Sequence, residues 1–227
     1  STNSSAKNMV ANVIETDNLN KIIETLAKAI NSRNYNSVSN LFTDKGYKVF
    51  QELIQYGNAR VLAYDNLNYL RYNDNIVCRS LKMSFSFSNN SRTFVEDVVI
   101  SFDNDAKIVN LVFGLGETAI NDILQQDKWS EQVRLNLIYF MEHYKTAFAL
   151  KRIDYIESIF SDDALIITGY VTQARPSGEN PYLNNKIVKY NRFTKEEYIK
   201  RLKYAVFSNE FINIKFNDNN IRKRGTG

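Results

Sequence analysis

An apolar residue at every second position in two runs, 77–87 and 94–102, is the feature that most constrains how this chain can fold. Every second residue of 77–87 is apolar apart from Arg79, and every second residue of 94–102 is apolar apart from Glu96. A period of two is typical of a strand that buries one face. The two runs therefore predict paired strands whose apolar face has to be covered by other elements.

A two-residue turn at Asn89-Asn90 is predicted between the two runs, because a short polar connection suits an antiparallel hairpin. That turn places Phe85 opposite Phe94 and Arg79 opposite Ile100. In this register all of the large apolar side chains lie on one face of the hairpin, as a half-buried sheet requires.

The stretch 129–167 predicts a long amphipathic helix, a short second helix, a turn and a strand. Apolar residues recur at intervals of three and four along both helices, and 164–171 is rich in β-branched residues. The charged face of the long helix includes Glu142, His143 and Lys145, and it is expected to face solvent.

An earlier stretch, 22–47, repeats this pattern at a constant offset. In both stretches the second helix ends in a similar motif, Leu41-Phe42-Thr43-Asp44 or Ile159-Phe160-Ser161-Asp162. Periodicity and capping residues predict the remaining elements. These are helices over 19–33, 46–55, 117–125 and 195–207, and strands over 59–64, 108–113, 186–190 and 210–216.

The repeat predicts an α+β chain of two tandem domains, and 227 residues are enough to build them. The expected divisions are a polar N-terminal segment over 1–17, a first domain over 18–126 and a second domain over 127–227. Phe42 and Phe160 are expected to occupy equivalent core positions.

The order of helix, helix ending in Leu/Ile-Phe-x-Asp, strand, helix and antiparallel meander resembles the nuclear transport factor 2-like superfamily. That superfamily also contains polyketide cyclases and ketosteroid isomerases. The resemblance implies two cone-shaped domains, each a helix pair packed on a curved antiparallel sheet. The tandem form is similar to exported proteins of unknown function from gut Bacteroidales, which implies a periplasmic or cell-surface location.

The second domain is expected to be incomplete, because only one meander strand, 210–216, follows its helices. The chain is accordingly expected to be a fragment of a longer protein. An unpaired edge at 210–216 would favour self-association through that strand.

In the cone fold the apolar face of the sheet lines a cavity, so the resemblance makes the two polar interruptions candidate ligand-binding residues. Arg79 and Glu96, with their neighbours Met83 and Phe85, are expected to line a ligand pocket. The alternative is that Arg79 and Glu96 reach solvent or pair with each other.

Two functional classes follow from these residues. The first is a non-enzymatic module that binds a small molecule or a protein of unknown specificity. The second is a small-molecule isomerase, cyclase or hydrolase, in which Glu96 acts as a base beside Tyr47 or Tyr64. The absence of convergent histidine, cysteine or acid clusters favours the first class.

Composition excludes several other functions. One histidine, His143, and one cysteine, Cys78, exclude a histidine-based triad, a multi-histidine metal site and an internal disulfide. Asp162-Asp163 suits a turn better than half of a metal site, and no metal or cofactor is expected. A net charge of +4, spread along the chain, argues against nucleic acid. No apolar run approaches the roughly 20 residues of a membrane helix.

Overall fold

The computed structural model describes residues 3–87, 92–172, 187–208 and 212–216, with side chains from Thr16 onward. The chain forms two compact units, Ser1–Leu150 with Asn213–Gly227, and Lys151–Ile212. Both units combine helices with antiparallel strands, so the predicted α+β class is confirmed. The predicted turn at 89–90 lies outside the described residues.

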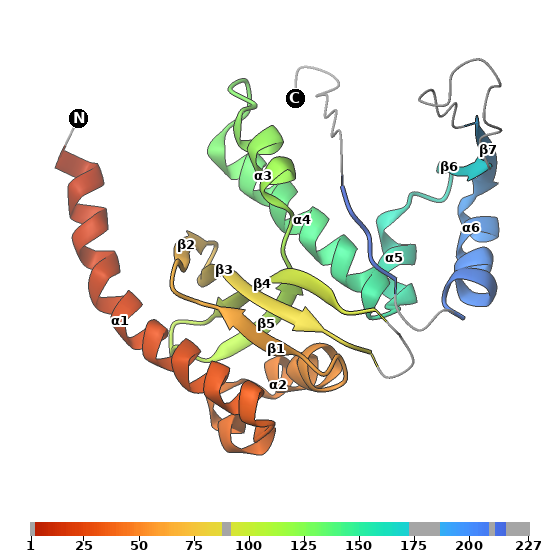
Figure 1. Cartoon of the computed structure of the whole chain (residues 1–227). Coiled ribbons are helices and arrows are strands. Elements are labelled where there is room, and N and C mark those ends of the chain that lie inside the picture. The colour runs from red at the N-terminus through yellow and green to blue at the C-terminus, as the bar shows by residue number, and fades with distance from the viewer. Residues whose placement is uncertain (1–2, 88–91, 173–186, 209–211, 217–227) are drawn as a thin grey trace, which may run out of the picture. The chain divides into compact units, whose positions relative to one another are not determined.

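The first unit has three layers, with helices on both faces of one antiparallel sheet (Figure 1). The sheet has the order β1-β3-β4-β5, and β2 also pairs with β3. Its strands are β1 Arg60–Ala63, β2 Asn68–Tyr72, β3 Asn75–Phe85, β4 Phe94–Phe102 and β5 Ile108–Phe113. Its helices are α1 Asn3–Ser32, a 3-10 helix Tyr35–Leu41, α2 Asp44–Phe50 with a π-helical turn Gln51–Gln55, α3 Glu117–Leu124 and α4 Glu131–Ala149.

The main core lies on the face of the sheet that α1 and α2 cover. Alternate residues of β3, Leu81, Met83 and Phe85, are almost fully buried there, as the period of two predicts. Phe42 is also buried, and its ring centroid lies 4.8 Å from that of Phe50 on α2. The predicted core position of Phe42 is therefore confirmed, and helix α1 begins at Asn3, well before the predicted residue 19.

The predicted hairpin register is confirmed from the pair Phe85–Phe94 to the pair Leu81–Val98 but is wrong beyond it. Cys78, not Arg79, lies opposite Ile100. The reason is a bulge after Cys78, where Ser80 adopts a left-handed φ of 71°. An extra residue in one strand reverses the alternation of its side chains.

The bulge exchanges the environments of Cys78 and Arg79. Cys78, expected on the polar side, is fully buried, and this burial raises the pKa of its thiol to about 12. Arg79 lies on the opposite face, where it shares a pocket with Val77 and Val99.

Strand β2 was not predicted, although it forms a tight hairpin with β3. Tyr72 pairs with Asn75, so the connection is the two residues Asn73-Asp74. Asn73 has a φ of 52°, which asparagine tolerates better than most residues. The hairpin adds Leu70 and Tyr72 to the face of the sheet opposite α1.

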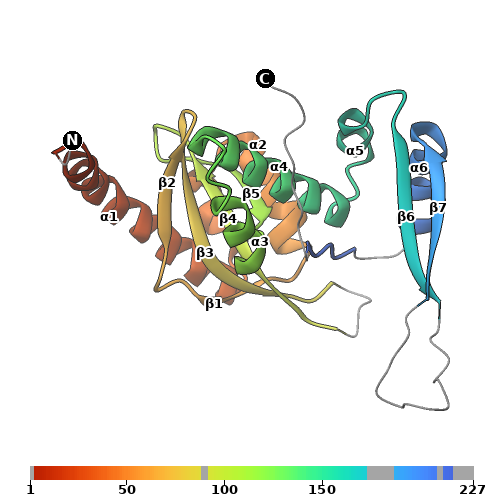
Figure 2. The ribbon, with the colours of Figure 1, turned by 90° about the horizontal axis from the view of Figure 1, so that it is seen from above.

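Helices α3 and α4 overlie that second face of the sheet, as the view from above shows (Figure 2). The first unit accordingly continues to Leu150, whereas a boundary was expected near 126–128. Thr146 fixes the helix to β5, because its hydroxyl accepts a 2.8 Å hydrogen bond from the Phe113 amide and donates one to the Glu142 carbonyl.

The predicted solvent-facing side of α4 is wrong in its C-terminal half. Glu142 and Lys145 are at most 5% exposed, whereas the apolar Phe140 is 41% exposed. The charged side faces inward because the sheet supplies partners of opposite charge, described below.

The second unit contains α5 Ile153–Ile159, β6 Leu165–Thr172, β7 Ile187–Thr194, α6 Lys195–Arg201 and a π-helical turn Leu202–Val206. Strands β6 and β7 form a two-stranded antiparallel sheet. A capping box begins α6, because Thr194 and Glu197 exchange hydrogen bonds. The predicted core position of Phe160 is wrong, because this residue is only partly buried, and its ring meets that of Tyr198 edge to face at 5.6 Å.

The predicted strand 210–216 is wrong for its described part, since residues 212–216 are not in a strand. Phe216 instead packs within the first unit, with its ring 6.3 Å from that of Tyr144. It also contacts a cluster from α3 and α4 that contains Leu115, Ala119, Ile123, Ile138 and Met141. The apolar side chain of Phe216 therefore packs against helices and does not belong to a strand.

Candidate ligand pocket

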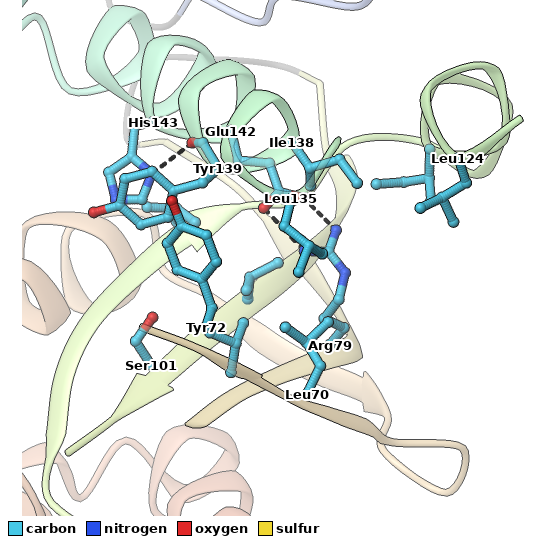
Figure 3. Close-up of a pocket in the computed structure, with 14 residues that line it drawn as sticks. Leu70, Tyr72, Arg79, Ser101, Leu124, Leu135, Ile138, Tyr139, Glu142 and His143 are labelled. Atoms are coloured by element: carbon cyan, nitrogen blue, oxygen red, sulfur yellow. Dashed lines mark hydrogen bonds and ion pairs between the residues drawn. The ribbon is translucent and has the colours of Figure 1, made fainter. Parts of the chain in front are cut away.

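A pocket of about 120 Å³ lies in the first unit between the sheet and helices α3 and α4 (Figure 3). Strands β2, β3, β4 and β5 form its floor, and α3 and α4 form its roof. Most of its lining is aliphatic or aromatic. The aliphatic part includes Leu70, Val77, Val99, Val112, Leu135 and Ile138.

A buried ion pair forms one wall of the pocket. The Arg79 guanidinium donates from Nη1 to Glu142 Oε2 over 3.0 Å, and from Nη2 to Glu142 Oε1. The Leu115 amide also donates to Oε1, at 3.0 Å. The side chains are 18% and 3% exposed, respectively. The two charges therefore neutralise each other through a bidentate contact, and they leave the pocket polar on one side without a net charge.

Three stacked rings form a second wall. The rings of Tyr72 and Tyr139 lie 4.9 Å apart at 23°, and those of Tyr139 and His143 lie 3.8 Å apart at 28°. Burial raises the pKa of the Tyr139 hydroxyl. A flat aromatic surface therefore lines one side of the pocket.

His143 is held by two hydrogen bonds. Its Nδ1 lies 2.8 Å from the Tyr139 carbonyl oxygen, and its Nε2 lies 3.0 Å from Asn110 Nδ2. A carbonyl can only accept, so Nδ1 donates and Nε2 accepts from the Asn110 amide. His143 was expected to face solvent, and it is instead half-buried with both ring nitrogens engaged.

A second buried ion pair joins α4 to the sheet outside the pocket. Lys145 Nζ donates to Glu96 Oε2 over 2.6 Å and to the Gly114 carbonyl over 3.1 Å. Both side chains are less than 10% exposed. The pairing of β4 with β5 ends at Val98, and Glu96 lies on β4 beyond that point. Lys145 therefore reaches Glu96 past the end of β5.

The expected pocket residues are divided between the two faces of the sheet. Arg79 lines the pocket, whereas Glu96, Met83 and Phe85 are not among the lining residues. Met83 and Phe85 are fully buried in the main core. The bulge at Ser80 explains the division, because it moves Arg79, together with Val77, to the other face and leaves Met83 and Phe85 in the main core.

The residues of the enzymatic alternative have other partners. The Tyr47 hydroxyl donates to Asn36 Oδ1 over 3.2 Å, and Tyr64 is 39% exposed. The Glu96 carboxylate accepts from Lys145. Arg79 and Glu96 do not pair with each other, because each binds a residue of α4.

The sequence contained an indication of the missed α4 contacts. Arg79 and Glu96 are charges of opposite sign on a buried sheet, and Glu142 and Lys145 are their complements one helical turn apart. For Tyr72, the indication was the short alternating run that precedes an Asn-Asp turn.

Comparison of the chain with protein-family models and with curated protein sequences finds no match. Within the described residues, no group of three or more histidine, cysteine, aspartate or glutamate side chains could hold a metal ion. None of the described helices is both long and apolar enough to cross a membrane.

Proposed function

We propose that this protein is a non-enzymatic binding module that holds a small, mostly apolar molecule between the sheet and helices α3 and α4. The observation that supports the proposal is the pocket of about 120 Å³, in which apolar walls surround a few convergent polar groups. The strongest of these groups already have partners, Arg79 with Glu142 and His143 with Asn110. Such groups orient a ligand more readily than they transfer its protons.

The resemblance to the nuclear transport factor 2-like superfamily forms part of the same proposal. In support of it, the first unit has a helix, a short helix followed by Phe42-Thr43-Asp44, a further helix and an antiparallel sheet. The strand that the resemblance places before the further helix is present only as a single bridge between Phe42 and Ile108. A second cone built on α5, β6, β7 and α6, and an exported location, belong to this proposal as well.

The enzymatic alternative, with Glu96 as a base, has less support. Its carboxylate is held by Lys145 and lies outside the pocket lining. A base needs access to the proton that it removes.

A screen of small molecules by amide chemical-shift perturbation tests the proposal. Ligands should shift the amides of Leu70, Val99 and Leu135, which line the pocket. Val99→Phe should abolish these shifts, because the larger side chain fills the space. Val95→Phe is the matched control, since Val95 lies on the same strand but is 54% exposed.

Thermal melting would establish that both variants fold. A screen in which no compound shifts these amides, or in which the shifts survive Val99→Phe but not Val95→Phe, would contradict the proposed function.

A further inference from the structure

We infer that the ligand of this pocket is a neutral phenol with a single aromatic ring. This inference rests on the proposed function and adds the chemical class of the ligand. Four properties of the pocket support it: its volume, the pairing of its charges, its aromatic wall and one hydroxyl without a partner.

The volume limits the ligand to one ring. An engineered apolar cavity of about 150 Å³ accepts benzene, so a pocket of about 120 Å³ suits a molecule of that size. Fused ring systems and long acyl chains exceed this space unless the walls move.

The paired charges favour a neutral ligand. An anion would seek Arg79, but both terminal nitrogens of that guanidinium donate to Glu142. A cation would seek Glu142, whose Oε1 also accepts from the Leu115 amide. Either ligand would have to break a buried pair and leave one charge without a partner, which is strongly unfavourable.

The wall of stacked rings favours a planar aromatic ligand. Figure 3 shows the rings of Tyr72, Tyr139 and His143 on one side of the pocket and the Arg79–Glu142 pair on the other. Aromatic rings attract one another in offset-stacked and edge-to-face arrangements, beyond the contribution of their buried area. A saturated ring of the same size would lack this contribution.

Ser101 supplies the reason for a hydroxyl on that ring. Its side chain lines the pocket and is 9% exposed. Among the described residues its hydroxyl makes no hydrogen bond, and its oxygen is not one of the atoms that are closed off from solvent. A ligand that fills the pocket covers this hydroxyl, and buried polar groups are normally hydrogen-bonded, so a ligand hydroxyl that exchanges a hydrogen bond with Ser101 would complete the site.

Titration of the whole chain with matched probes, followed by amide shifts and calorimetry, tests the inference. The probes are p-cresol, toluene, 4-methylcyclohexanol, 4-hydroxybenzoate and benzylamine. We expect p-cresol to bind most tightly, at least about tenfold tighter than the two charged probes. Ser101→Ala should weaken p-cresol about fivefold, the effect of one neutral hydrogen bond, and leave toluene unchanged.

The outcomes separate this inference from the proposed function. If a charged or saturated probe binds as tightly as p-cresol and Val99→Phe removes its binding, the phenol inference is overturned and the binding function stands. If p-cresol binds but Ser101→Ala has no effect, the phenol inference is also overturned. If none of the five probes binds, the ligand class is wrong, and the broader screen described above decides the binding function independently.

Discussion

Lys145 shows how a single charged residue can belong to the inner face of a helix. Its ammonium group donates to Glu96 and to the Gly114 carbonyl, and it lies 5.9 Å from the centroid of the Phe113 ring. Removal of such a group from water is costly, and the cost is offset only when the partners are well placed. The two hydrogen bonds and the short distance to Glu96 meet this condition.

Lys145→Ala should therefore destabilise the protein strongly, because it leaves Glu96 buried without a counter-charge. Loss of one partner from a buried pair typically costs about 3–5 kcal/mol. Lys28→Ala is the matched control, since Lys28 also pairs with a glutamate at 2.6 Å but both side chains are at least half exposed. Urea unfolding should show a large decrease in stability for Lys145→Ala and no clear change for Lys28→Ala. Two equally small effects would contradict the burial of this pair.

At the scale of the element, the approach of α2 to β5 depends on one glycine. A Cβ atom at Gly46 would lie 2.0 Å from the Ile108 carbonyl oxygen, which belongs to the backbone and cannot rotate away. Thr43 fixes this end of the helix, because its hydroxyl accepts from the Gly46 amide. The helix and the strand therefore meet at backbone contact distance.

Gly46→Ala should force α2 away from β5. It should lower the free energy of unfolding by about 1–3 kcal/mol, the usual cost of overpacking. Gly116→Ala provides the control, because nothing lies within 4 Å of a Cβ at that position. Thermal melts of the two variants make the comparison. Similar melting temperatures would show that the contact at Gly46 is looser than described.

The sequence predicted those elements whose local chemistry agrees with their environment. The strand 108–113, the helix that begins after Thr194 and the paired residues from Leu81 to Phe85 were predicted because periodicity and capping are local properties. The bulge at Ser80 was not predicted from the local pattern. It allows both Cys78 and Leu81 to be buried, and this burial depends on elements that lie elsewhere in the sequence.

The candidate site was predicted only in part, for the same reason. Arg79 was identified because a charge interrupts an apolar run, but its partner lies 63 residues away on α4. Glu142 was assigned to solvent because, without the sheet, a charged helix face is normally hydrated. Pairing between distant charges does not follow from the periodicity of either segment alone.

At the scale of the whole molecule, the second unit interrupts the first unit along the sequence, over 151–212. The first unit runs to Leu150 and resumes at Asn213, where Phe216 contacts the cluster formed by α3 and α4. The repeated helix pattern at 22–47 and 129–167 suggested a new domain at the second occurrence. The contacts of α4 instead make that helix the outer layer of the first unit and the roof of the pocket.

A double-mutant cycle between Arg79 and Glu142 tests this account most directly, because only an α4 helix packed on the sheet can couple the two residues. Arg79→Met and Glu142→Met should each destabilise the protein, since each leaves a buried charge without its partner. The double variant should lose less stability than the sum of the single variants, by about 2 kcal/mol or more in urea unfolding. Effects that add within about 0.5 kcal/mol would show that the two side chains do not interact and would contradict the account.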